Sequence, residues 1–148
     1  MRMVLDIDIK LKFQLVKSIF LKPKKVTKTS NIASSEKSIA VLPFVNMSND
    51  PQQEYFSDGL SEELINMFTK IPGLKVIGRT SSFAFKGKNE DLRIIGQKLG
   101  VAYLLEGSVW KSGTTLRITA QLIKASDGTH LWSETYDREM DDIFKVQS

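Results

Sequence analysis

The residues of this chain that could perform acid–base or metal chemistry are few and lie far apart. The sequence has one histidine, His130, and no cysteine. These counts exclude sites built from several histidines, thiolate metal sites and cysteine nucleophiles. His130 directly follows Thr129 after the Asp127-Gly128 turn, where a partly exposed structural imidazole is the expected role. A single remaining general base without an evident nucleophile indicates no catalytic site.

Acidic residues give two further candidates for chemistry. Glu106 and Glu134 each interrupt an apolar stretch. A carboxyl group buried in this way has a raised pKa and is a candidate functional acid. Pairing of either residue with Arg117 or Arg79 is the interpretation that we favour.

Two other sequence features resemble ligand sites but do not meet the requirements. Gly87-Lys88 would belong to a phosphate-binding loop only with glycine at position 82 and Ser or Thr at position 89, where the chain has Ser82 and Asn89. The adjacent acids at positions 141 and 142 begin a predicted helix, where carboxylates favour the helix dipole. We therefore predict neither a metal nor a cofactor.

The elements that would position these residues begin with a buried strand and a helix. Residues 39–44 are consecutively apolar, which is typical of a strand that is covered on both faces, and Pro43 is expected near its exit. Asp50 is a candidate N-cap for the helix that follows, and Pro72-Gly73 ends it. One apolar stripe at spacings of three and four runs along this helix: Phe56, Leu60, Leu64, Met67, Phe68 and Ile71.

The remaining pattern predicts an α/β fold. A second strand covers residues 74–78, and a loop at residues 80–89, anchored by Phe83 and Phe85, follows it. Asn89 is expected to cap a helix that runs to Leu99, with Gly100 as its left-handed C-terminal stop. Turns containing glycine then separate three strands, at residues 102–111, 115–125 and 129–138. Right-handed crossovers make the first three strands parallel. We predict a three-layer sandwich with a five-stranded mixed sheet of order 2-1-3-4-5, strand 4 antiparallel and helices on both faces.

The first 37 residues differ from the rest in charge. They contain nine Lys or Arg against three acidic residues, although the whole chain of 148 residues has a formal net charge of only +4. Alternation from Leu5 to Leu15 favours an amphipathic strand, but Ile7, Leu11, Leu15 and Ile19 also lie four apart, which fits a helix. We interpret residues 1–37 as a basic leader and linker. Deleting residues 1–36 is expected to cost little stability, and their predicted role is attachment, by strand addition to a protein or by weak contact with an anionic membrane.

Composition limits the class of protein. A hydrophobic content of 41% supports an ordinary core, and lysines interrupt every candidate signal peptide or membrane span. As written, the sequence predicts a cytoplasmic chain. No recognition helix or interleaving of basic and aromatic residues supports binding to nucleic acid.

Several short, separated segments of the sequence resemble one bacterial family, the TolB-amino-terminal-like or FlgO-like domain. These segments are residues 38–48, 55–64, 78–88, 105–109 and 130–138. The resemblance implies an α/β domain over residues 38–148, which ends at the start of a C-terminal helix. It also implies an accessory or interaction module, often beside tetratricopeptide repeats, cyclase domains or winged-helix regulators. Family members are often membrane-anchored or periplasmic.

The topology predicts one candidate surface. In an open sheet of order 2-1-3, ligands bind beyond the carboxyl ends of the strands where the order reverses. Polar and basic residues follow the first two strands at that edge: Asn46, Met47, Ser48, Asn49, Arg79, Thr80, Ser81, Ser82, Lys86 and Lys88. They suit an anionic ligand or the backbone of a protein partner better than catalysis.

Two classes of function follow from these observations. The first is a non-enzymatic interaction or sensory module of a larger envelope-associated or signalling protein. The alternative is a regulatory domain that binds an anion or nucleotide, or a part of a protein named as an adenylate or guanylate cyclase. Paired metal-binding carboxylates, which a cyclase requires, are not evident in the sequence.

Overall fold

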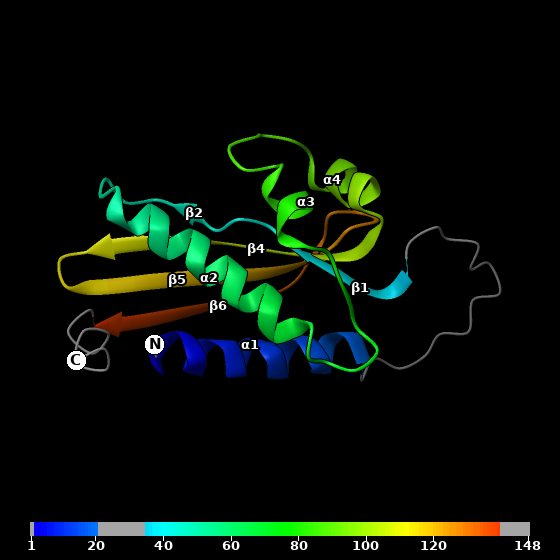
Figure 1. Ribbon diagram of the computed structural model, residues 1–148, viewed down its shortest axis with the longest axis horizontal. Coiled ribbons are helices and arrows are strands. Elements are labelled where there is room, and N and C mark those ends of the chain that lie inside the picture. Colours follow the sequence, from blue (N-terminus) through cyan, green and yellow to red (C-terminus); the bar gives the residue numbers. More distant parts are fainter. Residues whose placement is uncertain (1, 21–34, 140–148) are drawn as a thin grey trace.

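A computed structural model describes residues 2–20 and 35–139 of the chain. Its centre is one mixed sheet with the strand order β3-β1-β4-β5-β6, and the short β2 pairs with β4 beyond the end of β1 (Figure 1). The strands are β1 (Ser35–Val41), β2 (Val45–Asn46), β3 (Lys75–Val76), β4 (Val101–Ser112), β5 (Thr115–Lys124) and β6 (His130–Glu139). The predicted order of the five main strands is confirmed. The additional strand β2 was not predicted.

Pro43 separates β1 from β2 because a proline cannot donate a hydrogen bond to the ladder. β1 pairs in parallel with β3 on one side and with β4 on the other. After Pro43, the backbone N–H of Phe44 donates to Ser61 Oγ at 2.9 Å, and Val45 resumes pairing at Ser108. The predicted strand exit is therefore confirmed, with a continuation of β1 in β2.

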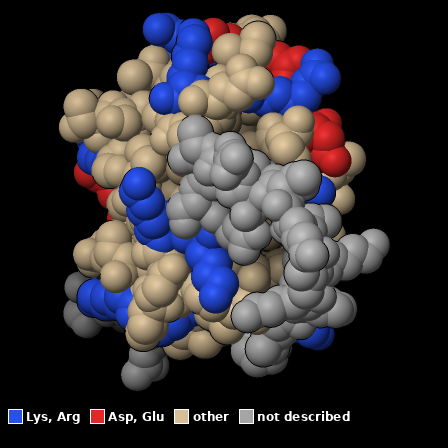
Figure 2. Space-filling view, turned by 90° about the vertical axis from the view of Figure 1, so that its right-hand side faces the viewer, with Lys and Arg blue, Asp and Glu red and all other residues tan. Residues whose placement is uncertain are grey.

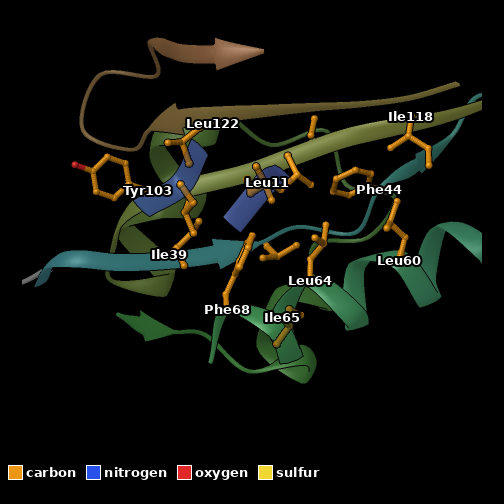
Figure 3. Packing of buried hydrophobic residues seen from close by; sticks show 14 of the residues in the cluster. Leu11, Ile39, Phe44, Leu60, Leu64, Ile65, Phe68, Tyr103, Ile118 and Leu122 are labelled. Atoms are coloured by element: carbon orange, nitrogen blue, oxygen red, sulfur yellow. The ribbon is translucent and has the colours of Figure 1, made fainter. Parts of the chain in front are cut away.

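One face of the sheet packs against α2 (Gln52–Phe68). Asp50 supports its first turn, because its carboxylate accepts a hydrogen bond from Gln52 N at 3.0 Å. Leu60, Leu64 and Phe68 are fully buried, as the predicted stripe required. These side chains form the large core cluster together with the apolar side of β5 (Figure 3).

The opposite face carries a smaller core under α4 (Leu92–Leu99). Asp91, rather than the predicted Asn89, caps this helix by accepting from Arg93 N at 2.8 Å. Hydrogen bonds from Arg93 lower the pKa of Asp91 to about 2. Gly100 ends the helix with φ +67°, the expected left-handed stop. Helices thus cover both faces of the sheet.

The predicted loop at residues 80–89 contains a short helix, α3 (Arg79–Phe83). The two expected aromatic anchors are both partly buried, and they pack against different cores. Phe83 packs against the larger cluster and Phe85 against the smaller one. This segment therefore joins the two sides of the fold near β1.

The leader forms a helix, α1 (Arg2–Phe20), and the interpretation of residues 5–15 as a strand is wrong. Leu11 and Leu15 are 0% exposed and Ile19 is 6% exposed, so the four-residue spacing describes the buried face. Figure 1 shows α1 beside α2 and β6, both of which it contacts. Leu11, Leu15 and Ile19 are therefore occupied in the core, whereas Ile9 is 57% exposed, and the predicted contact of the leader with a membrane stays a prediction.

Basic side chains are spread over the face that carries α4 and the start of β1, while acidic ones lie at its margins (Figure 2). Two cations of α4 are paired: Lys98 Nζ lies 2.6 Å from Glu90 Oε1 and Arg93 Nη2 lies 2.8 Å from Asp91 Oδ2. Exposed pairs of this kind contribute little to stability. They do reduce the net positive charge of the face.

Candidate functional site

The three strands β4, β5 and β6 have one apolar and one polar face. Leu116, Ile118, Ala120 and Leu122 alternate along β5 and are all fully buried on the apolar face. The register places three rows of side chains on the other face, which are Trp110-Arg117-Asp137, Ser108-Thr119-Thr135 and Glu106-Gln121-Ser133. α4 packs farther along the strands, over Leu104 and Ile123. The candidate site lies at the end of this polar face, away from α4.

Trp110 is the largest side chain on the polar face, and 44% of it is exposed. The Arg117 guanidinium lies 5.7 Å from the centroid of the indole ring, a cation–π contact. Arg117 in turn binds Asp137 through two hydrogen bonds, of 2.8 and 3.2 Å. These bonds lower the pKa of Asp137 and raise that of Arg117. The indole therefore stands beside a cation that an ion pair holds in place.

The loop after β2 is held by hydrogen bonds on both sides. Asn46 Nδ2 donates to the carbonyl of Asp50, and Asn46 Oδ1 accepts from Ser48 N. The Lys111 backbone N–H donates to Ser48 Oγ at 2.6 Å, and Lys111 Nζ lies 3.2 Å from Asp50 Oδ2. The backbone hydrogen bond from Gln52, followed by the bond from Lys111, lowers the pKa of Asp50. The loop is thus fixed against β4.

Together, the fixed loop and β4 form an open hollow of about 370 Å³. Its lining residues are Met47, Ser48, Asn49, Asp50, Trp110 and Lys111. Met47 is 62% exposed, and Val45, which pairs with Ser108 on the same face, is 57% exposed. We call Val45, Met47 and Trp110 the Trp110 surface. It is an apolar surface with a charged rim formed by Asp50, Lys111 and Arg117.

The structure divides the predicted surface into two parts. Met47, Ser48 and Asn49 line the hollow beside Trp110, and Asn46 supports that loop. The basic residues of the other part bind acidic side chains of α2. Arg79 pairs with Glu62, and its guanidinium lies 4.3 Å from the Phe83 ring centroid.

Lys86 makes the second link to α2. Its ammonium group donates to both oxygens of Asp58, at 2.9 and 2.7 Å, and lies 3.2 Å from Glu54. The hydrogen bond to Asp58 is the main cause of the raised pKa of Lys86. These contacts neutralise charge that an anionic ligand would require. As an anion site, this part of the predicted surface is weaker than its sequence suggested.

The remaining predicted residues of this part differ in exposure. Thr80, Ser81 and Lys88 are exposed, whereas Ser82 is fully buried in α3. The Ser82 hydroxyl has no hydrogen-bond partner among the described residues. No described feature brings these residues and the hollow at Trp110 into one pocket. As a ligand or partner surface, they stay a prediction.

The two glutamates have partners other than those expected. Burial raises the pKa of Glu106, and the nearby His130 lowers it by a smaller amount. Arg117 binds Asp137 and Arg79 binds Glu62, so the favoured pairing of Glu106 with either arginine is wrong. Glu134 instead accepts a hydrogen bond of 3.4 Å from Gln14 Nε2 of α1. Neither glutamate lies in the hollow.

Sequence reasoning missed Trp110, Lys111 and Val45. A signal for Trp110 was present, because it occupies the same alternation register as Glu106 and Ser108 on β4. An aromatic side chain in a polar register points to an exposed contact surface. Val45 was missed because β2 itself was not predicted.

The described residues contain neither a candidate metal cluster nor a helix that could span a membrane. Within residues 2–20 and 35–139, no three or more His, Asp or Glu side chains are grouped so that they could hold a metal ion. No helix in the described part of the chain is long and apolar enough to cross a membrane.

Comparison with known proteins identifies the family. Residues 35–147 match the family model described as "HilA/YgeH-like transcriptional regulator, second domain". The chain belongs to this family. The matched range contains the whole sheet, α2, α3 and α4, while α1 lies outside it.

A relative in Rhizobium meliloti (strain 1021) is named "Putative adenylate cyclase 3". It is 56% identical over 110 residues, which cover 74% of this chain and 19% of the relative. The chain therefore spans about a fifth of the length of this relative.

Solved structures with the same fold come from bacterial proteins. Lipoprotein GNA1162 of Neisseria meningitidis has a TM-score of 0.58 at 22% identity and covers 70% of this chain and 80% of that chain. The LpoB C-terminal domain of Escherichia coli has a TM-score of 0.56 at 15% identity and covers 85% of this chain and 93% of that chain. These likenesses show a shared fold. The finer assignment to the TolB-amino-terminal-like or FlgO-like family stays a prediction.

Proposed function

We propose that this domain is a non-enzymatic interaction or sensory module of a larger regulatory or signalling protein, and that it binds a protein partner through the Trp110 surface. The observation that carries the proposal is the exposure of three apolar side chains on one face of the sheet, two of which, Met47 and Trp110, line the hollow. Val45, Met47 and Trp110 are 57%, 62% and 44% exposed. Large exposed apolar groups with a polar rim are typical of protein interaction sites.

The chemistry of the Trp110 surface suits binding. Tryptophan and arginine are the residue types that contribute most to binding energy at interfaces. Here the ion pair with Asp137 fixes Arg117 beside the indole before any partner arrives. A side chain that is already ordered loses less conformational entropy when it binds. The geometry therefore supports recognition without a large rearrangement.

The comparisons support a modular role. The family is described as the second domain of transcriptional regulators, and the named cyclase relative contains this stretch as 19% of its length. A domain that binds a protein or senses a signal suits both contexts. We infer that the partner is a protein or another domain of the longer protein.

Site-specific photo-crosslinking tests the proposal. A photoreactive phenylalanine replaces Trp110 in one variant and Ile94 in a matched control, since Ile94 of α4 is 43% exposed and lies on a different element. Irradiation of cells that produce the chain should give a discrete protein adduct at position 110 and none at position 94. Equal labelling at both positions, or none at either, would contradict the proposal.

The name of the relative also motivates a test for catalysis. The purified chain, incubated with ATP or GTP and Mg²⁺, is expected to form no cyclic nucleotide. Reproducible product that an internal substitution abolishes would overturn the non-enzymatic assignment. Calorimetric titration with the same nucleotides tests the alternative of a nucleotide-binding regulator. That alternative requires binding that Lys86→Ala and Arg79→Ala weaken.

A further inference from the structure

α1 supplies core residues although it lies outside the family domain. The family match begins at residue 35, whereas Leu11, Leu15 and Ile19 of α1 belong to the same buried cluster as α2 and the apolar side of β5. Figure 3 shows Leu11 within this cluster together with Leu64 and Phe68. A domain that is defined without α1 must leave this surface open or cover it with another element. The surface under α1 is therefore an acceptor for a helix.

The contacts of α1 define which helix this surface accepts. Among the α1 side chains that the structure describes, the buried ones, Leu11, Leu15 and Ile19, are spaced by four residues, so an aliphatic stripe of about two turns faces the domain. Val16 and Phe20 pack partly against the same cluster. At the end of α1, the Phe20 ring lies so close to the α2–β3 turn that a Cβ built on Gly73 would be 3.5 Å from it.

Polar contacts at the margin of the stripe add orientation. Gln14 donates to Glu134 of β6, and Lys10 Nζ lies 5.8 Å from the centroid of the Tyr136 ring. Lys37 Nζ lies 4.8 Å from the centroid of the Phe20 ring, at the other end of the helix. Beside its apolar surface, the acceptor thus offers a carboxylate oxygen of Glu134, the aromatic ring of Tyr136 and the ammonium group of Lys37. This chemistry matches an amphipathic helix with a lysine beside its apolar stripe.

We propose that α1 is a resident ligand of a helix-binding groove formed by α2, β5 and β6, and that another helix with aliphatic residues at every fourth position and a lysine placed to reach Tyr136 can replace it. The link between α1 and β1, residues 21–34, keeps α1 near the groove and raises its effective concentration to roughly millimolar. An external helix therefore competes poorly until the link is cut or α1 is displaced. The groove is separate from the Trp110 surface, because it lies on the apolar face of the sheet.

The test uses the full chain with a specific protease site placed within residues 21–34. A fluorescent peptide of residues 2–20 is titrated against the chain before and after cleavage, with anisotropy as the readout. Cleaved chain should bind the peptide saturably, and uncut chain should bind it at least about tenfold more weakly. A matched peptide with Leu15→Glu should fail to compete, whereas one with Lys17→Ala should compete as well as the unchanged peptide.

Several results would overturn the proposal. They are no binding to the cleaved chain, equal binding to cut and uncut chain, or equal competition by the Leu15→Glu peptide. A dimer that takes up no peptide would assign the groove to a second copy of the chain instead. Amide hydrogen exchange on the uncut chain gives an independent measurement. If α1 can leave the groove, its amides should exchange through an opening of lower free energy than the amides of β4 and β5. Exchange of α1 only on global unfolding would contradict the proposal.

Discussion

Gly107 occupies a position on β4 where neighbouring atoms approach the backbone closely. A Cβ at this position would lie 2.2 Å from the Thr119 carbonyl oxygen and 2.5 Å from the Phe44 ring. Because one of these neighbours is backbone, Gly107→Ala should lower the free energy of unfolding by about 1–3 kcal/mol or more. Urea denaturation would measure the change.

Gly59 provides the matched control for Gly107. It lies in α2, and no heavy atom is within 4 Å of the position of an added Cβ. Gly59→Ala should raise the free energy of unfolding by about 0.5–1 kcal/mol, since alanine favours the helix. If both substitutions had the same effect, close packing at Gly107 would not be the cause.

Glu106 should make stability depend on pH. Burial raises its pKa above the usual 4.5, so the folded chain holds this proton more tightly than the unfolded chain. The stability that comes from this tighter proton binding is fully present below the pKa of Glu106 in the unfolded chain. It is lost as the pH rises through the pKa of Glu106 in the folded chain. Glu106→Gln should therefore raise the melting temperature at pH 7 relative to the parent and leave little difference at pH 4. Glu63→Gln, at an exposed position, serves as the control and should change the melting temperature equally at both pH values. If Glu106→Gln also changed the melting temperature equally at pH 7 and pH 4, this explanation would be refuted.

At the residue scale, sequence reasoning succeeded where a residue type has one structural meaning. Pro43 ends the ladder and Gly100 ends a helix, because backbone chemistry alone dictates both roles. It failed where the partner of a side chain decides its role. Arg79 and Lys86 were predicted to face a ligand, but the acidic residues that neutralise them lie on α2, and a single sequence does not show that proximity.

At the scale of elements, the leader shows how two periodicities can coexist. Alternation from Leu5 to Leu15 fits a strand, while spacing by four residues fits a helix. The apolar side chains of β5 and α2 favour the helix, because a helix can bury Leu11, Leu15 and Ile19 against them on one side. The choice depends on tertiary packing that the local pattern does not contain. The division of the chain at residue 37 stays a prediction.

Burial of α1 reverses the expectation for stability. Leu15 is 0% exposed, so Leu15→Ala should lower the free energy of unfolding by about 2–5 kcal/mol. Lys17→Ala on the exposed side of α1 should change it by no more than about 0.5 kcal/mol. Chemical denaturation of both variants distinguishes the two effects. An unchanged free energy of unfolding for Leu15→Ala would instead support the expectation from sequence that the leader contributes little to stability.

Two valines on neighbouring elements test the central position of β1. Val41 is fully buried at the end of β1, whereas Val45 of β2 is 57% exposed. Val41→Asp places an unpaired charge in the core and should cost several kcal/mol, enough to unfold a marginal domain. Val45→Asp should leave the melting temperature nearly unchanged. A folded Val41→Asp variant with the parent melting temperature would contradict the placement.

At the scale of the whole molecule, the topology and the loop residues Met47, Ser48 and Asn49 of the candidate surface could be predicted, but Val45 and Trp110 could not. Hydrophobic runs, glycine turns and the right-handed crossover rule were sufficient for the order of the five main strands. The Trp110 surface depends on β2, whose two residues lie beyond Pro43, and on the register that places Met47 beside Trp110. Such short pairings carry no periodic signal of their own.

The central claim is that the Trp110 surface is where this domain binds its partner. Calorimetric titration of the protein captured at position 110 tests it most directly, with the parent chain, Trp110→Ala and Ile94→Ala compared at equal folded fraction. Removal of a central tryptophan at an interface typically costs about 2 kcal/mol or more, so Trp110→Ala should weaken binding by about thirtyfold or more, while Ile94→Ala should leave affinity unchanged. Equal affinities for all three chains would contradict the account.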